Sequence, residues 1–343
     1  MYTGESQHRS QYGPDRVAPS PARPAARSPR GRRRFAAWLA VLLLIPGTVP
    51  AVARAMDVDG PTPVPQLLAF LPWFLAPGWL ALLAAVVARR FLLVAWSLAL
   101  LGTTAWFLQP YGSGQTVPSR EPSAQIRVLT ANLRFGEAMD AFLEALRSHR
   151  PHLVSVQECD SGCARTLRSR EVRRTYPHQV ITGNEPAEGS AVLSVYPLAA
   201  GARVPGELSM PSAVADVEGI DVRFQVAHPM PPMPDSMDSW RRELGALRAM
   251  ASGRGETPTI MAGDFNASQD HAAFRAIVDT GMRDSARLLG RSRTPTWPVP
   301  YSPPLGAQID HVLVSEGLTP VDAQFFELSG SDHQALLVDV RLY

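Results

Sequence analysis

The sequence has no lysine and only two cysteines among its 343 residues, so all 33 of its basic residues are arginine. Two cysteines exclude a small domain built on several disulfides, and no second cysteine pair or nearby histidine pair completes a zinc site. Charge is also sparse, because charged residues make up 19% of the chain and hydrophobic residues 45%. This balance excludes a wholly disordered or fibrous protein. The length predicts one large domain, or two modest ones, with additional segments.

The small net charge of +2 hides an uneven distribution of charge along the chain. Residues 1–34 contain 8 Arg against two acidic residues, Glu5 and Asp15, a net charge of +6, and we expect a disordered basic tail that stays in the cytoplasm. Residues 110–343 contain 22 Arg against 27 acidic residues, a net charge of −5. This acidic part does not form a basic clamp for nucleic acid, and its acids could gather where a cation binds.

Residues 35–109 contain three apolar segments, at about 35–52, 66–88 and 91–108, and none has an interior charge. Each is close to the length that crosses a bilayer, so we predict three transmembrane helices and a membrane bilayer as a partner. Three buried core helices are the less favoured alternative.

Arginines set the expected orientation of these helices. The cluster at residues 30–34 and the pair Arg89-Arg90 should both stay in the cytoplasm, so three crossings place residues 110–343 outside the cell membrane. A cleaved secretory signal ending near Ala51-Val52-Ala53 is an alternative for the first segment. It leaves the C-terminal part outside as well. In that compartment Cys159 and Cys163 could form a disulfide, although two free thiols remain the alternative.

A linker at residues 110–123 precedes a region, 124–343, in which strand and helix patterns alternate. Alternating β-branched runs predict strands and apolar residues at helical spacing predict helices. The strands are expected at 126–132, 153–157, 191–195, 222–227, 259–262, 308–314 and 336–341, and the helices at 137–150, 239–250 and 272–278. This mixture suits one α/β or α+β domain.

Strong polar residues stand where these apolar strands end or begin. They are Asn132, Glu158, His228, Asp264, Asn266, Asp310, Asp332 and His333. Each alone has a structural explanation as a cap or turn residue, because Asp and Asn often terminate strands. Together they supply carboxylate and amide oxygens for Mg²⁺ or Mn²⁺ and two histidines for acid, base or charge stabilisation. Hydrolysis of a phosphodiester needs these groups.

Six short motifs in order resemble the endonuclease/exonuclease/phosphatase superfamily, which has the deoxyribonuclease-I-like fold. They are Thr-Ala-Asn132-Leu, Val-Gln157-Glu158, Ala-His228-Pro, Gly263-Asp264-Phe265-Asn266, Gln-Ile-Asp310-His and Gly-Ser331-Asp332-His333. The resemblance covers residues 124–343 and leaves the membrane segments outside it. It implies an α/β (α+β) four-layer sandwich in which two packed mixed β-sheets are flanked by helices, with the site at one end.

The resemblance also implies roles for these residues. Asn132 and Glu158 would lie at the divalent ion, with Asp332 as a further ligand. Asp264 would orient or deprotonate the attacking water, and Asn266 would hold the phosphate or the nucleophile. His333 paired with Asp310 would be the general acid or base, or the cation that stabilises the pentavalent phosphorus, and His228 would contact a non-bridging oxygen. His311 is expected to be structural, because neighbouring side chains on a strand face opposite sides.

Two features depart from the family pattern. An arginine is common after the Leu-Ser of its middle strand, where this chain has Val195, and the tyrosine of the apurinic endonucleases has only Tyr196 and Tyr301 as candidates. A role in abasic-site repair is therefore disfavoured.

Other residues bear on the substrate. The run of Arg165, Arg168, Arg170, Arg173 and Arg174 favours a solvated helix face over a phosphate contact. Trp297 and Tyr301 could stack on a base, touch a lipid interface or pack a loop, and residues 229–234 form a stiff proline-rich loop near the expected rim.

The first hypothesis is a membrane-anchored, extracytoplasmic, divalent-metal-dependent phosphohydrolase, a nuclease-like phosphodiesterase acting on nucleic acid or another phosphodiester. The second is a phospholipid or sphingomyelin-type phosphodiesterase. The third is a catalytically silent binding protein on the same fold.

Overall fold

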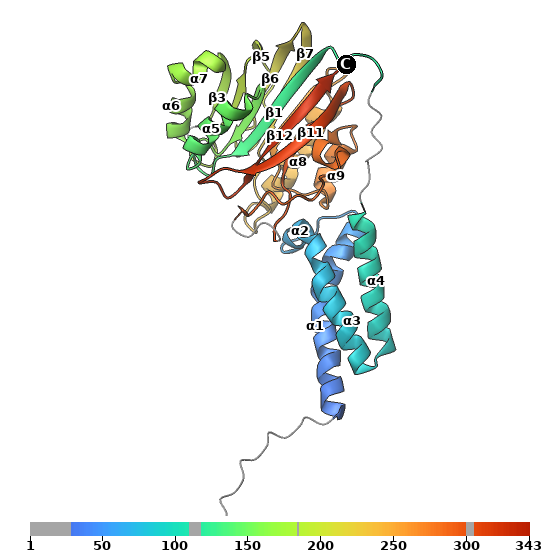
Figure 1. The fold of residues 1–343 in the computed structure, drawn as a ribbon. Helices are drawn as coiled ribbons and strands as arrows, with labels where there is room; N and C mark the ends of the chain where they lie inside the picture. Colours follow the sequence, from blue (N-terminus) through green and yellow to red (C-terminus); the bar gives the residue numbers. More distant parts are fainter. Residues whose placement is uncertain (1–28, 110–117, 184, 300–304) are drawn as a thin grey trace, which may run out of the picture.

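The computed structural model describes residues 29–109, 118–183, 185–299 and 305–343. Most of the expected basic tail, much of the linker and Tyr301 lie outside these residues. A bundle of helices is followed by a β-sandwich, and Figure 1 shows the sandwich at one end of the bundle, next to the short helix α2 (Val64–Ala69).

The bundle consists mainly of α1 (Pro29–Ala55), α3 (Leu75–Ala88) and α4 (Phe91–Leu108). By length and composition, three helices of the described chain are apolar enough to cross a membrane. Large apolar side chains cover the outside of the bundle; Trp38 is 75% exposed and Leu92 79%. Such a surface suits lipid better than water. Arg34 and the pair Arg89-Arg90 line one groove, which brings the two arginine groups to the same end of the bundle.

The expected single helix at 66–88 is not continuous. It is divided into α2, the 3₁₀ helix η1 (Leu71–Phe74) and α3, so the apolar span begins at Leu71. Prolines explain the divisions, because a proline lacks the N–H that an interior helical position requires and is tolerated in the first turn. Pro65, Pro72 and Pro77 each fall in the first turn of one of these three elements.

The sandwich contains two six-stranded mixed sheets. The first has the order β11-β12-β1-β2-β4-β3, with β1 (Ala124–Asn132), β2 (Leu153–Gln157), β3 (His178–Thr182), β4 (Ser190–Ser194), β11 (Leu318–Glu327) and β12 (Gln334–Leu342). The second has the order β5-β6-β7-β8-β10-β9, with β5 (Leu198–Ala200), β6 (Ser212–Val217), β7 (Ile220–Ala227), β8 (Thr259–Asp264), β9 (Arg283–Asp284) and β10 (Asp310–Val314).

Helices cover the outer faces of the sheets (Figure 1). The first sheet carries α5 (Met139–His149), α6 (Ser161–Leu167) and α7 (Arg170–Thr175), and the second carries α8 (Met237–Ser252) and α9 (Ala272–Val278), with the short α10 (Ser285–Leu288) beside β10. Buried side chains from both sheets, such as Val128, Phe224 and Val338, form the core between them. The expected four-layer sandwich is confirmed.

Strand directions bring the polar strand ends to one edge of the sandwich. β1 runs parallel to β2, and β7 runs parallel to β8. β12 is antiparallel to β1, and β10 is antiparallel to β8. The ends of β1, β2, β7 and β8 therefore meet the beginnings of β10 and β12, and we call this the site edge.

Two local features also follow the sequence. Cys159 and Cys163 form a disulfide with a Cα–Cα distance of 5.2 Å, and the Asp160 carboxylate caps α6 by accepting from the Cys163 N–H at 2.7 Å. All five residues of the arginine run on and around α6 and α7 are exposed, which agrees with a solvated helix face.

Candidate active site

Four polar side chains from the two sheets are buried at the site edge. Asn132 ends β1, Asp264 ends β8, Asp310 begins β10, and His333 directly precedes β12. Asp264 and Asp310 are direct partners in the β8–β10 ladder. Each of the four is at most 5% exposed, so their charges must be balanced by one another or by a bound ion.

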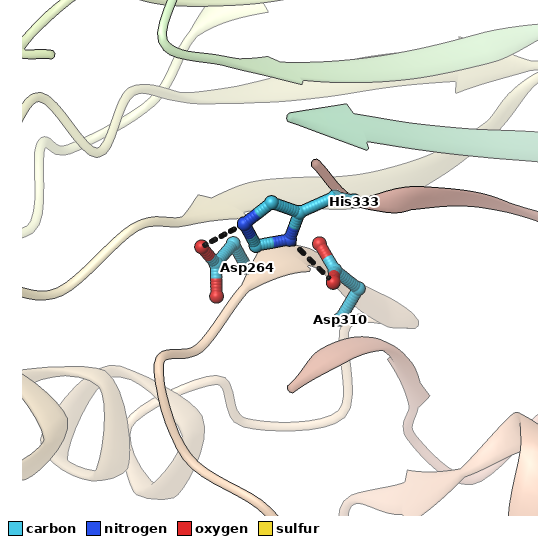
Figure 2. A group of neighbouring side chains, drawn as sticks. All are labelled: Asp264, Asp310 and His333. Carbon is cyan, nitrogen blue, oxygen red and sulfur yellow. Dashed lines mark hydrogen bonds and ion pairs between the residues drawn. The ribbon is translucent and has the colours of Figure 1, made fainter. Parts of the chain in front are cut away.

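His333 lies between two carboxylates, as Figure 2 shows. Its Nδ1 lies 2.9 Å from Oδ2 of Asp310, and its Nε2 lies 3.8 Å from Oδ2 of Asp264. Burial opposes a charged imidazole, but the charges of Asp310 and Asp264 outweigh it and raise the pKa of His333 to about 10. His333 is therefore an imidazolium held in a fixed orientation.

Asp264 has an environment that suits a proton acceptor. Burial raises its pKa to about 7, against the opposing effect of the His333 charge. Its Oδ1 accepts from the backbone N–H of Asn266 at 2.8 Å, and its Oδ2 accepts from Nδ2 of Asn132 at 3.2 Å. A general base works best when its pKa lies near the operating pH.

Glu158 directly follows β2 and lies on the other side of Asn132. Its Oε1 accepts from Nδ2 of Asn132 at 3.0 Å, and its Oε2 accepts from the backbone N–H of Phe135 at 3.1 Å. Burial raises the pKa of Glu158. Arg134, Phe135, Glu158 and Asn266 all have positive φ values, between 46° and 57°. Backbone strain of this kind gathers at functional sites.

The carboxylates of the site edge fit a divalent cation. Glu158, Asp264, Asp310 and Asp332 supply four acidic groups, against the single imidazolium of His333 among the described residues that contact them. One oxygen of Asp310, Oδ1, is buried without a hydrogen-bond partner in the described chain. Asp264, Asp310 and His333 lie close enough together to be considered as metal ligands, because one candidate ligand atom from each lies within 4.8 Å of the others.

Those three residues do not make the ion site themselves. Nδ1 of His333 is at hydrogen-bond distance from Asp310, and Nε2 lies 3.8 Å from Asp264, beyond a hydrogen bond. As an imidazolium, the ring carries a proton on each nitrogen and has no lone pair for a metal. Glu158 is better placed, because its carboxylate forms no salt bridge with any residue that the structure describes, although the more distant charge of His333 acts on it. Asn132 presents its Nδ2 to Glu158, while its Oδ1 accepts from the Arg134 N–H at 3.0 Å, so it orients this carboxylate. Asp332 is close enough for its charge to raise the pKa of Glu158, and its Oδ2 accepts from Nε1 of Trp297 at 3.1 Å.

His228 and Asn266 complete the predicted set. His228 is buried and neutral, because burial lowers its pKa to about 3, and its Nδ1 has no hydrogen-bond partner in the described chain. Asn266 donates from Nδ2 to the carbonyl of Pro229 at 3.0 Å, which ties the loop after β8 to the loop after β7. All eight predicted residues therefore stand at the site edge.

Three further positions that the sequence singled out, His311, Val195 and Tyr196, lie away from the catalytic set. His311 pairs with Asp284 at 2.9 Å on the face opposite Asp310, which fits a structural role. Val195 and Tyr196 follow β4 at the far edge of the first sheet, since Ser194 pairs with Leu153 at the start of β2. Tyr196 is therefore not the missing tyrosine, and the absent arginine does not alter the site edge.

Two residues support the site without having been predicted to do so, Thr296 and Ser331. Thr296 accepts from the backbone N–H groups of Ile309 and Asp310 through its Oγ1, at 3.0 and 3.2 Å. These two bonds engage the N–H groups of Ile309 and Asp310 outside the sheet. They explain why β10 begins at Asp310 and not at Gln308. Ser331 donates to the carbonyl of Asn132 at 2.7 Å and accepts from the His333 N–H at 2.9 Å. Only Ser331 had a local signal, because it belongs to the Ser-Asp-His motif; Thr296 lies far from the others in sequence.

Solved structures support the fold. A humanized zebrafish (D. rerio) TDP2 matches 64% of this chain and 100% of its own, with a TM-score of 0.54 and 13% identity. An AP endonuclease from Archaeoglobus fulgidus matches 62% of this chain and 98% of its own, with a TM-score of 0.51 and 17% identity. An endonuclease/exonuclease/phosphatase from Beutenbergia cavernae matches 64% of this chain and 72% of its own, with a TM-score of 0.50 and 19% identity.

Comparison with curated protein sequences gave no match. The model of the endonuclease/exonuclease/phosphatase family matches residues 129–333, more than half of the chain and the whole interval from β1 to His333. The chain belongs to the endonuclease/exonuclease/phosphatase family, whose members act on phosphate esters.

Proposed function

We propose that the protein is a divalent-metal-dependent phosphohydrolase anchored in the membrane by residues 35–109, with residues 124–343 as its catalytic domain outside the cell. The buried chain Asp310–His333–Asp264, next to Glu158, carries this proposal. It combines a fixed cation, a carboxylate with a pKa near neutrality and a further carboxylate for a metal.

In this mechanism Asp264 orients the attacking water and accepts its proton through Oδ2. The water oxygen bonds to phosphorus as the bond from phosphorus to the ester oxygen breaks, and the leaving oxygen takes a proton from solvent. His333 stays charged beside Asp310 and stabilises the negative charge that develops on the phosphoryl oxygens. His228, neutral and with its Nδ1 unpaired among the residues that the structure describes, contacts a non-bridging oxygen. Mg²⁺ or Mn²⁺ held by Glu158, with Asp332 as a further ligand, would neutralise phosphate charge.

The extracytoplasmic location is supported by two observations. Arg34, in the second turn of α1, and Arg89-Arg90, between α3 and α4, line one groove. Figure 1 shows the start of α1 and the connection between α3 and α4 at the end of the bundle away from the sandwich, and the positive-inside rule makes such an end cytoplasmic. The disulfide between Cys159 and Cys163 is of a kind that persists in oxidising compartments.

We expect Glu158→Gln to weaken binding of Mn²⁺ at least about tenfold, because the substitution removes a negative ligand charge and keeps the size of the side chain. Isothermal titration of the full-length protein with Mn²⁺ measures this change. Glu316 is exposed and follows the end of β10, at the edge of the sandwich opposite the site edge, which we call the far edge. Glu316→Gln is the matched control and should bind the ion like the wild type. An unchanged affinity in Glu158→Gln would place the metal elsewhere.

The substrate class is tested with purified full-length protein in detergent, with Mg²⁺, Mn²⁺ or EDTA. The substrates are bis-p-nitrophenyl phosphate, plasmid DNA, RNA and phospholipid vesicles. Metal-dependent cleavage that disappears in Asp264→Ala supports a phosphohydrolase, and the preferred substrate separates a nuclease from a phospholipid phosphodiesterase. A folded, metal-binding protein that cleaves none of them favours a silent binding protein. The intact Glu158, Asp264 and His333 argue against that last outcome.

A further inference from the structure

The loops that carry the site rest on the ends of the membrane helices. We define the outer segment as residues 56–74, between α1 and α3. We define the site loops as residues 229–236 after β7, residues 265–271 after β8, and residues 293–299 with 305–309 before β10. Figure 1 shows α2, within the outer segment, directly next to the sandwich. Each site loop adjoins a residue of the proposed catalytic set.

A buried carboxylate ties two of these loops to two membrane helices. Asp270 is 1% exposed and pairs with Arg54 in the last turn of α1, Nε to Oδ1 at 3.4 Å. It also pairs with Arg293, whose Nη2 lies 3.0 Å from Oδ1. The same Nη2 donates to the carbonyl of Phe107 near the end of α4, at 3.0 Å. Breaking a buried pair of this kind leaves an uncompensated charge, so the contact fixes the relative position of its parts.

The outer segment adds a second set of bonds, to the start of α9 and to two of the site loops. The Asp59 carboxylate accepts from the backbone N–H groups of Ala272 and Ala273 at 2.7 and 3.0 Å, and so caps α9 from the membrane side. Nε2 of His271 lies 2.8 Å from the carbonyl of Pro65. A third loop is reached through Gln66, which donates to the carbonyl of Pro232.

The position of these contacts relative to the membrane surface follows from the ends of the apolar helices. Trp73 donates from Nε1 to the carbonyl of Gly306 at 3.1 Å, and Trp73 lies inside the apolar span that begins at Leu71. Phe107 is the penultimate residue of the span that ends at Leu108. At about 1.5 Å per residue, both lie within about 5 Å of the ends of their spans. The site loop before Asp310 is therefore level with the membrane surface.

Exposed apolar side chains stand on the loops of the site edge. Phe135 follows Asn132 and is 48% exposed, Met233 follows His228 and is 53% exposed, and Leu305 precedes Asp310 and is 50% exposed. Met233 and Leu305 are next in sequence to Pro232 and Gly306, which bond to the outer segment, and apolar side chains in such a place suit contact with lipid. The catalytic part carries a net charge of −5, which opposes a polyanionic nucleic acid as the substrate.

From these contacts we infer that the active site opens onto the outer surface of the bilayer and that its substrate is a phosphate ester carried by a membrane lipid. The inference rests on the proposed function and names its substrate class. A substrate confined to the membrane surface meets the site at a high effective concentration, whereas a soluble ester does not.

The orientation is tested first, in full-length protein reconstituted into phosphatidylcholine vesicles that contain a lipid with a nitroxide on its headgroup. A fluorophore is attached at Met233→Cys or, as the far-edge control, at Glu316→Cys; the native cysteines are joined in a disulfide. We expect the fluorescence to be lost at position 233 and retained at position 316. Equal quenching at the two positions would overturn the orientation.

The substrate class is tested in the same vesicles with added phosphatidylglycerol, by measuring the phosphate headgroups released from either lipid. We expect release from the bilayer to be at least about tenfold faster than from water-soluble dibutyryl phosphatidylglycerol at equal bulk concentration. The double variant Arg54→Gln/Asp59→Asn, which loosens the contact with the helices, should lose this preference and keep hydrolysis of bis-p-nitrophenyl phosphate. Arg89→Gln, at the other end of the bundle, should keep both.

Equal rates on the two forms of lipid, or nicking of plasmid DNA without release of headgroups, would overturn the lipid substrate. Hydrolysis of bis-p-nitrophenyl phosphate in the same preparation shows whether only the lipid substrate is wrong or the phosphohydrolase activity as well. If it persists while the lipid results fail, only this inference is wrong. If it is absent as well, the proposed function itself fails.

Discussion

Replacement of His333 by alanine is expected to lower kcat by roughly 10²- to 10⁴-fold, the usual effect of removing a positioned acid, base or charged group from a transition state. The variant removes the imidazolium that lies between Asp310 and Asp264 and leaves both carboxylates buried without it. Steady-state hydrolysis of bis-p-nitrophenyl phosphate by full-length protein measures the loss.

His311→Ala is the matched control for this experiment. His311 is another buried histidine that pairs with a carboxylate, Asp284, at 2.9 Å, but it lies on the face of β10 opposite Asp310, where its Nε2 is 3.1 Å from the carbonyl of Ala267. We expect its loss to lower the melting temperature and to leave kcat of the folded protein close to that of the wild type. Wild-type turnover in His333→Ala, or an equal loss in both variants, would remove His333 from the mechanism.

Asp264→Asn is expected to lower kcat by a similar factor, because the amide cannot accept the proton of the attacking water. The substitution preserves the shape of the side chain, and the amide oxygen can still accept from the backbone N–H of Asn266. Stability should therefore change little, and affinity for Mn²⁺ should persist because Glu158 remains. Parallel measurement of kcat, melting temperature and Mn²⁺ affinity separates these effects.

The control for Asp264→Asn is Asp279→Asn, an exposed acidic residue after α9 that should leave all three quantities unchanged. A loss of kcat in Asp264→Asn that came only with unfolding or with loss of the metal would contradict a role for Asp264 in activating water.

The site edge was predictable because its residues interrupt apolar strands at their ends. β2 forms at 153–157 as expected, and Glu158 follows it in the left-handed conformation. Asn132 and Asp264 likewise end β1 and β8. Of the residues that hold these side chains in place, Thr296 was not predictable. Thr296 contacts Asp310 only after the chain has folded back, and no local pattern marks such a contact.

The missed elements have physical reasons as well. The edge strand β11 contains Pro320, which argues against a strand in the sequence, because proline cannot donate to a ladder. An edge position and an irregular register between Pro320 and Asp322 accommodate it. For the segment at 66–88, the sequence favoured one continuous helix where the structure has three elements. Hydropathy measures composition and does not detect where a proline begins a new helix.

The central claim is that a metal-dependent active site is built around Asp264 and His333. It is tested most directly by stripping the full-length protein with EDTA, adding back Mg²⁺ or Mn²⁺, and following hydrolysis of bis-p-nitrophenyl phosphate in the wild type and in His333→Ala. We predict that hydrolysis disappears with EDTA, returns with the ion in the wild type, and does not return in the variant. Hydrolysis that persists without the ion, or that returns equally in both proteins, would contradict the account.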